Sequence, residues 1–146
     1  MKSGLKKDYK YIRIEGNVIA ADTGHAKGVF AIISKLLLSG EMEQGDADLM
    51  KEIDAWFETE LPFPPQCGNG DPVICFFKTD NADMMMKMIK PQLWLLEKYN
   101  VPYYVIYTNN PGEILYEDDF QIVVRAERQI VEGRQAMWFQ VKDQQK

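Results

Sequence analysis

Some segments of the chain carry apolar residues at helical spacing, and others carry short apolar runs that are typical of strands. This difference separates the predicted helices from the predicted strands. Two segments in the first half carry apolar residues at helical spacing. The first runs from a cap at Asp22 or Thr23 to Gly40, and the second runs from about Asp46 to Leu61. Their apolar positions are Ala26, Val29, Phe30, Ile33, Leu36 and Leu37, then Leu49, Ile53, Trp56, Phe57 and Leu61. The charged positions of the second helix, Lys51, Glu52, Asp54 and Glu58, are expected outside.

Strand patterns flank these helices. Residues 9–21 predict a pair of strands, because weak alternation around Tyr11 is followed by a Glu15-Gly16-Asn17 turn and a short apolar return. Residues 62–72 are rich in proline and glycine, which excludes a helix or a central strand there. This segment is expected to be an internal loop, because neither half of the chain is large enough for a good core.

Residues 73–108 follow a strand–helix–strand pattern. Residues 73–78 and 103–108 form short apolar runs, and residues 81–99 between them have helical spacing. Pro91 lies inside the helical segment, where we expect a kink or a break. A strand, a helix and a second strand of this length predict a right-handed βαβ crossover with adjacent parallel strands.

The last part of the chain predicts antiparallel strands. Residues 114–116 and 120–124 flank an acidic turn, and residues 136–141 are a further strand candidate. Residues 125–132 fit either a strand or a short helix. Together the patterns predict one α+β domain over residues 1–146, with two N-terminal helices. Its sheet is expected to be mixed, with one βαβ crossover at about 73–108 and added antiparallel strands.

Size, charge and cysteine content indicate a single-domain protein and argue against several functional classes. A chain of 146 residues is typical of a single domain that folds without a metal or a disulfide. Its net charge of -5 argues against binding to nucleic acid, and it has no apolar run long enough to span a membrane. Its two cysteines, Cys67 and Cys75, lack the spacing of a metal site, so a reducing cytoplasm is the simplest location.

The ends of the two predicted parallel strands give the first candidate site. Each strand is followed by polar residues: Lys78, Thr79, Asp80 and Asn81 after the first, and Thr108, Asn109 and Asn110 after the second. Ligands of open α/β sheets bind at such an edge, and a helix start there favours an anion. We therefore expect a small polar or anionic ligand between the two loops. The alternative is that these residues only cap the helix and form a turn.

The acidic turn gives the second candidate site. It contains Glu117, Asp118 and Asp119, with Glu113 upstream. These carboxylates could bind a hard cation such as Mg²⁺ or act as an acid–base pair. Alternation along a strand would bring Glu117 and Asp119 together. The alternatives are a solvated turn that prevents edge pairing and an acidic patch for a basic partner.

Other chemically notable residues point to core packing or to a partner. His25 is the only histidine, which excludes a multi-histidine zinc site. Four methionines, Met84, Met85, Met86 and Met88, fall on one predicted helix. Two of them face its apolar stripe, and the other two are expected to be exposed or to meet a partner. Because no glycine-rich phosphate loop occurs, nucleotide binding of the common kinds is not expected.

The segment from Pro111 to Val123 resembles a group of small uncharacterised bacterial proteins. They share a Pro-Gly pair followed by Tyr-Glu-Asp, two residues and Gln-Val, which corresponds here to Tyr116, Glu117, Asp118 and Gln121. The similarity extends back to the second predicted helix. It implies a compact cytosolic domain of bacterial or phage origin and a shared purpose, structural or functional, for these four residues.

Two functions from different classes follow. The first is a binding or regulatory module that acts through a protein partner or a small polar ligand, without a cofactor or a metal. The second is a small metal-assisted hydrolase or transferase that uses Glu117, Asp118 and Asp119. The first is favoured because no set of residues meets the geometric demands of a known chemistry.

Overall fold

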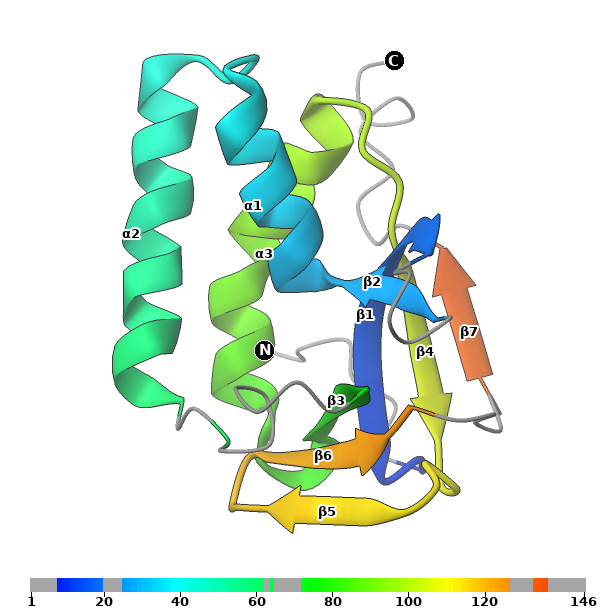
Figure 1. The fold of residues 1–146 in the computed structure, drawn as a ribbon. Helices are drawn as coiled ribbons and strands as arrows, with labels where there is room; N and C mark the ends of the chain where they lie inside the picture. The colour runs from blue at the N-terminus through cyan, green and yellow to red at the C-terminus, as the bar shows by residue number, and fades with distance from the viewer. Residues whose placement is uncertain (1–7, 20–24, 62–63, 65–71, 127–132, 137–146) are drawn as a thin grey trace.

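The computed structural model describes residues 8–19, 25–61, 64, 72–126 and 133–136. Of these, residues 134–136 are described by their backbone alone. Within these ranges the chain forms a seven-stranded sheet with three α-helices packed on one face (Figure 1). The elements are β1 (Tyr11–Ile19), β2 (Ala26–Gly28), α1 (Val29–Ser39), α2 (Gln44–Glu60), β3 (Val73–Lys78), the 3-10 turn η2 (Thr79–Asn81), α3 (Asp83–Lys98), β4 (Tyr104–Thr108), β5 (Ile114–Glu117), β6 (Gln121–Arg125) and β7 (Gly133–Ala136). The protein is a small α+β domain.

The sheet is antiparallel at each pairing of the described strands, and β1 lies at its centre. The strand order is β5-β6-β3-β1-β4-β7, with β2 also paired to β1. Strands β3 and β4 run in the same direction, because both are antiparallel to β1, but β1 separates them. The prediction of a mixed sheet with adjacent parallel strands is therefore wrong. A pattern local to residues 73–108 contains no information about a strand that arrives from residues 11–19.

The predicted turn at Glu15-Gly16-Asn17 is also wrong, because β1 continues through it. Strand β2 pairs back onto β1 at Glu15↔Gly28 and Ile19↔Ala26. Gly16 is buried, and a Cβ atom at this position would lie 2.8 Å from Cγ2 of Ile32. The glycine therefore allows α1 to approach the sheet closely, and it does not reverse the chain.

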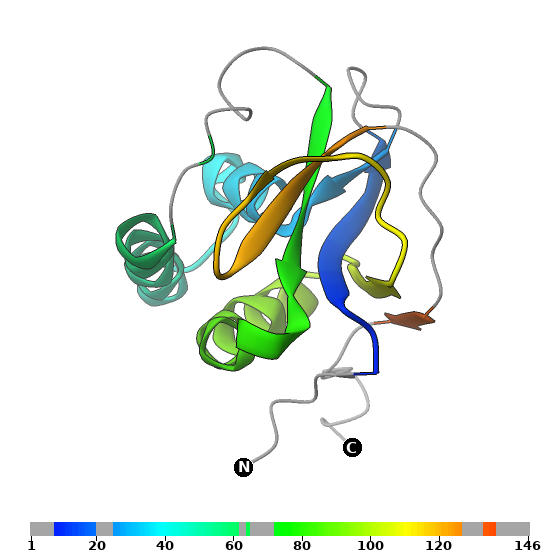
Figure 2. The ribbon, with the colours of Figure 1, turned by 90° about the horizontal axis from the view of Figure 1, so that it is seen from below.

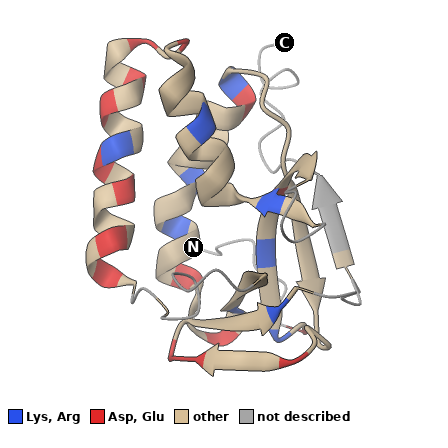
Figure 3. Cartoon of the chain, in the orientation of Figure 1, with Lys and Arg blue, Asp and Glu red and all other residues tan. Residues whose placement is uncertain are grey.

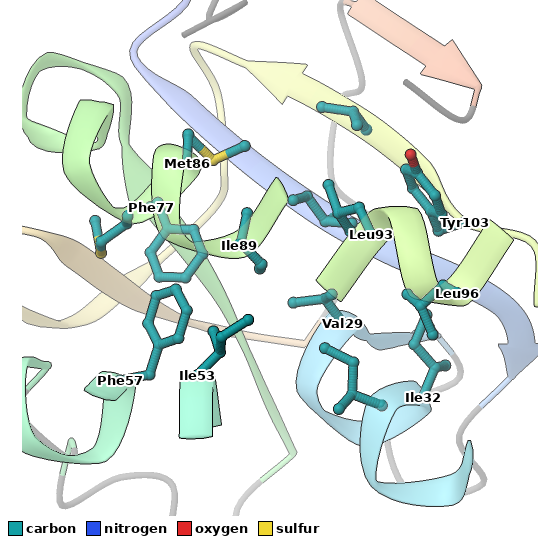
Figure 4. Close-up of a cluster of buried hydrophobic side chains, with 14 of the residues drawn as sticks. Val29, Ile32, Ile53, Phe57, Phe77, Met86, Ile89, Leu93, Leu96 and Tyr103 are labelled. Carbon is teal, nitrogen blue, oxygen red and sulfur yellow. The ribbon is translucent and has the colours of Figure 1, made fainter. Parts of the chain in front are cut away.

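The main core lies between the sheet and the helices (Figure 4). Helix α1 buries Val29, Ile32, Ile33 and Leu36; α2 buries Met50, Ile53 and Phe57; α3 buries a longer stripe that includes Met85, Met86, Ile89, Leu93 and Leu96. Each set follows the spacing of one helical face. The sheet contributes Ile12, Ile14, Phe77, Val105 and Tyr107, and Tyr103 joins them from the residue just before β4.

The sheet curls, so that β5 and β6 lie across the direction of β1 and β4 (Figures 1 and 2). The face turned away from the helices carries a second, smaller core of Ile74, Phe76, Ile106, Ile122 and Val124. Strand twist brings residues of β3, β4 and β6 together there. Both faces of β3 and β4 are thus largely buried, which explains why the sequences of these two strands are almost continuously apolar.

The remaining predictions have mixed outcomes. The strand at residues 73–78 is confirmed, and strands 114–116 and 120–124 correspond to β5 and β6 within two residues. Helix α1 begins at Val29, later than predicted, and Gly40 follows it in the left-handed conformation. Helix α3 continues across Pro91 without a break into two helices.

Some predicted features lie outside the described residues: most of the 62–72 loop, the helix cap at Asp22 or Thr23, Cys67, the alternatives for 127–132 and the strand residues 137–141. Among the helices that the structure describes, none has both the length and the apolar character needed to cross a bilayer.

Candidate functional site

A cavity of about 540 Å³ lies between α1, α2 and the sheet. Its walls are mainly apolar: Ile14, Val29, Phe30, Phe57, Leu61, Pro64, Phe76 and Phe77. Six further residues add polar or reactive groups: Arg13, Ser34, Asp54, Glu58, Cys75 and Gln121. Ligand sites in proteins typically combine this size with an apolar lining and a few polar groups, so the cavity is the leading candidate site.

The cavity exists because β1 and β3 separate after a short ladder. They pair only at Tyr11↔Lys78 and Ile12↔Phe77. Beyond these pairs the Arg13 side chain crosses the gap, donating from Nη1 to the Cys75 carbonyl at 3.0 Å and from Nη2 to the Ala26 carbonyl at 2.9 Å. Its Nε donates to Glu15 at 3.1 Å. The hydrogen bond from the Arg13 guanidinium to Cys75 thus links β1 to β3 where the backbone hydrogen bonds between these two strands have ended.

Aromatic side chains line the helical side of the cavity. The Phe30 ring meets Phe57 edge-on with 5.0 Å between ring centroids, and it meets Phe77 at 6.5 Å in the same manner. Phe57 also packs against Trp56 at 5.0 Å. Rings from α1, α2 and β3 therefore support one another, which gives the cavity a firm apolar wall.

Two carboxylates of α2 form the charged part of the wall. Asp54 and Glu58 are four residues apart, so their side chains lie on the same helical face. Burial raises the pKa of Asp54; a hydrogen bond from Gln92 opposes that rise, and the charge of Glu58 adds to it. Within the part of the chain that the structure describes, neither carboxylate forms an ion pair with a lysine or an arginine.

Gln92 positions Asp54 from the neighbouring helix. Its buried side-chain amide donates to Asp54 Oδ1 at 2.7 Å and to the Met50 carbonyl at 3.2 Å. Its Oε1 is buried and accepts no hydrogen bond from the residues described. A buried amide oxygen without a hydrogen-bond donor lowers the stability of the fold. The hydrogen bond from Gln92 to Asp54 is therefore accompanied by a loss of stability at Oε1.

This cavity was missed by the sequence interpretation. The helical pattern predicts Asp54 and Glu58 on the solvent face of the second helix and assigns no role to Arg13. Glu58 is exposed, as predicted, whereas Asp54 is half-buried. The i,i+4 spacing of two acids beside Phe57 was visible in the sequence. The cavity itself was not, because it depends on where β3 diverges from β1, a pairing between residues more than 60 positions apart.

The polar residues after β3 and β4 do reach one edge of the sheet, but β1 begins between them. Tyr11 pairs with both Lys78 and Thr108. The residues just before β1 bridge the two loops: Thr79 Oγ1 donates to the Tyr9 carbonyl at 2.5 Å, and the Lys10 amide donates to Asn109 Oδ1 at 2.7 Å. The argument for a ligand between these loops relied on adjacent strands, and β1 removes that basis.

The other residues of this predicted site also have contacts within the protein or face solvent. Thr108 Oγ1 accepts the amide of Asn110 at 2.8 Å, and Asp80 is exposed. Asn81 Nδ2 donates to the Asp119 carbonyl at 2.6 Å. The contact of Thr108 with Asn110 fits the alternative of a turn. The alternative of a helix cap is wrong, because Ala82 precedes α3 without a side-chain cap, and Thr79 and Asn81 bond to the segment before β1 and to the acidic turn.

The acidic turn connects β5 to β6 and is built around Asp118. Its Oδ1 accepts the amides of Phe120 at 2.8 Å and Gln121 at 3.0 Å, while its Oδ2 accepts the Tyr116 hydroxyl at 2.9 Å and Gln121 Nε2 at 3.1 Å. Burial acts to raise the pKa of Asp118, but these four hydrogen bonds outweigh it and hold the pKa below the usual value. Tyr116, Asp118 and Gln121 thus share a structural cluster.

The neighbouring acids of the turn make separate contacts. Glu117 pairs with Lys78 at 2.5 Å, an interaction that raises the pKa of the lysine. Glu113 pairs with Arg125 at 3.2 Å on the surface. Among the described residues no three His, Cys, Asp or Glu side chains gather as a metal site would require.

Comparison with family models, with curated proteins and with solved structures found no match to this chain.

Proposed function

We propose that the protein is a non-enzymatic binding module whose ligand occupies the cavity between α1, α2 and the sheet. The observation that carries the proposal is the combination of a 540 Å³ apolar cavity with two acids that have no cationic partner among the described residues. The ligand it favours is a small, mostly apolar molecule with a positively charged amine. This differs from the small polar ligand that the strand ends suggested.

The apolar lining sets most of the expected binding energy. Burial of ligand surface against Phe30, Phe57 and Phe77 contributes roughly 25 cal/mol per Å² of apolar area removed from water. The volume suits a ligand of one or two rings or a medium-length alkyl chain. Affinity for the apolar body is therefore expected without much chemical discrimination.

The charged groups provide the selectivity. Arg13 directs three of its five N–H groups to Cys75, Ala26 and Glu15, and the ion pair with Glu15 offsets its charge. The negative charges of Asp54 and Glu58 face the same cavity, and an ammonium group of the ligand would offset their mutual repulsion. The site should therefore prefer an amine to the matching alcohol, and the alcohol to the matching acid.

A matched ligand series tests this directly. The midpoint of thermal unfolding is measured with 3-phenylpropylamine, 3-phenylpropanol and 3-phenylpropanoate, each over a range of concentrations. An amine present at about 100 times its Kd stabilises the fold by about 2.7 kcal/mol, and the two analogues should shift the midpoint less. Because Asp54 must be ionised to attract the amine, binding should weaken as pH falls through its raised pKa.

A cavity-filling variant provides the control. Ser34 is an exposed residue of α1 that lines the cavity, so Ser34→Trp should weaken amine binding by about tenfold or more. Lys35 is its exposed neighbour and does not line the cavity, so Lys35→Trp should bind like the wild type. Equal binding by both variants, or no preference for the amine, would contradict the proposal.

The enzymatic alternative takes second place. A metal-assisted hydrolase or transferase would need Glu117, Asp118 and Asp119 to turn their oxygens toward a cation, whereas Asp118 accepts four protein hydrogen bonds. Thermal unfolding with Mg²⁺ or Mn²⁺ separates the two functions. A metal-dependent rise that disappears in Asp119→Asn would favour the enzyme. The cytoplasmic location and the bacterial or phage origin stay predictions.

A further inference from the structure

A second hollow runs along the opposite side of α2, between that helix and α3. It has a volume of about 530 Å³ and no lining residue in common with the first cavity. Helix α2 contributes Leu49, Ile53 and Trp56 to its floor, and α3 contributes Met88 and Pro91. We call this hollow the α2/α3 groove.

The groove leaves apolar surface uncovered. Leu49 is 40% exposed, and Trp56 and Met88 are only partly buried. Nearby on α3, Met84 is 57% exposed, while Met88 packs its buried part against the main core. Methionine and tryptophan beside one groove form a surface that can adapt to an apolar partner.

Acidic residues dominate the helix that forms one wall. Within Gln44–Glu60 there are six acids and one basic residue, Lys51 (Figure 3). Glu52 and Glu60 of α2 line the groove, and Lys87 lines it from α3. The rim on the α2 side is therefore negative, and an occupant with basic residues on that side would complement it.

The end of α2 adds an independent indication. Glu58 and Glu60 lie in its last turn, and that turn contains no basic residue. Acids at a helix C-terminus oppose the helix dipole and cost stability. Such a local conflict is expected where a surface serves binding, and a cationic partner would relieve it.

We propose that the α2/α3 groove docks a basic amphipathic helix of a partner protein. From Leu49 to Glu60 the groove follows α2 for about 17 Å, which is about three helical turns. A helix can place apolar residues at i, i+3, i+4 and i+7 along that length, with lysine or arginine beside them. A second copy of this chain fits less well, because its own α2 would bring like charges to the acidic rim.

Two designed peptides test the charge and the shape together. Both are 16-residue helices with the same leucine and tryptophan stripe, one flanked by lysine and arginine and the other by glutamate. Binding is measured by fluorescence anisotropy of labelled peptides at 50 and 300 mM salt, and the contact surface is mapped by amide NMR shifts. The basic peptide should bind at least about tenfold more tightly, lose affinity at high salt and perturb Leu49, Trp56 and Met88.

Charge-reversal variants supply the matched control. Glu52→Lys with Glu60→Lys should weaken binding of the basic peptide by about tenfold and improve binding of the acidic one. Glu41→Lys with Asp48→Lys reverses two exposed acids outside the groove and should change affinity by about twofold at most. Leu49→Asp replaces an exposed side chain, so it should abolish binding while the thermal midpoint stays close to wild type.

Three results would overturn the proposal. The first is that neither peptide binds, and the second is that both bind equally well. The third is concentration-dependent self-association abolished by Leu49→Asp, which would make a second copy the occupant. Ser34→Trp should leave peptide binding unchanged, so failure of the groove and failure of the amine-binding cavity are distinguishable.

Discussion

The acidic turn between β5 and β6 differs from the acidic helix α2 in how its surroundings shift the pKa of a carboxylate. In the turn, Asp118 accepts four hydrogen bonds and its pKa is lowered. On α2, Asp54 accepts one side-chain hydrogen bond beside a cavity and its pKa is raised. Burial is the largest influence on the pKa of Asp54, and one side-chain hydrogen bond opposes it, whereas four hydrogen bonds together outweigh the effect of burial at Asp118.

This difference separates structural acids from acids available to a ligand. A carboxylate whose oxygens are saturated by nearby donors is fixed in place and stabilises the fold. One that borders a cavity without a cationic partner costs stability and is open to a binding partner. The cluster of three consecutive acids stood out in the sequence, but the more dispersed acids of α2 border both hollows of the structure.

The largest effect is expected from removing the structural carboxylate. Asp118→Ala leaves two backbone amides and two side-chain donors without their acceptor and should lower the free energy of unfolding by about 2 kcal/mol. Asp118→Asn keeps one acceptor oxygen and should cost about half as much. Urea unfolding at pH 7 measures both, and equal stability of Asp118→Ala and the wild type would show that the turn does not depend on this residue.

The pH dependence of the same variants sharpens this result. The pKa of Asp118 is lower in the folded protein than its ordinary value of 3.8, so its stabilising contribution is fully present above that value. It is lost as pH falls through the lower, folded-state pKa. The difference in stability between wild type and Asp118→Asn should therefore be constant near neutral pH and shrink in acid below about pH 4.

Asp54 should show the opposite sign. Its pKa is higher in the folded protein, so its ionised form costs stability above that raised value, and the cost fades as pH falls toward 3.8. Asp54→Asn should be as stable as the wild type or more stable at pH 7, by less than about 1 kcal/mol because solvent screens the half-exposed group. Urea unfolding from pH 3.5 to 7 tests this, and a marked loss of stability at pH 7 would contradict it.

Gln92→Leu tests the same group from the neighbouring helix. It removes the donor that lowers the Asp54 pKa, so the pKa should rise further. An NMR titration of the Asp54 carboxyl carbon measures the change, and Gln44, which bonds Asp48 at the exposed start of α2, provides the control position. A Gln44→Leu variant should leave the Asp54 pKa unchanged.

The smallest effect is expected at the end of α2. Glu60→Lys replaces an exposed acid in the last turn with a cation that suits the helix dipole, and it should raise stability by about 0.3 kcal/mol. Glu60→Gln should give about half of that gain. Thermal unfolding at low salt detects the series, and a loss of stability on neutralising Glu60 would indicate that this carboxylate has a stabilising contact.

Residue periodicity alone predicted the elements that rely on local spacing. The stripe Met85, Met86, Ile89, Leu93 and Leu96 identified α3, and the apolar run at 73–78 identified β3. The expected division of the methionines is confirmed for Met85 and Met86, which are buried, and for Met84, which is exposed, whereas Met88 is partly buried against the core. Each of these depends on neighbours within about four residues, where helix and strand geometry fix which side chains share a face.

Only the tertiary structure decided how these elements meet. The insertion of β1 between β3 and β4, the close contact of Gly16 with Ile32 and the bridge from Arg13 to Cys75 join residues far apart in the chain. Strand pairing is chosen by the whole hydrophobic surface that must be covered, and a local pattern does not encode it. The amino-acid sequence therefore determined the helices, most strands and the supply of acids, while long-range packing determined which acids became structural and which came to border a cavity.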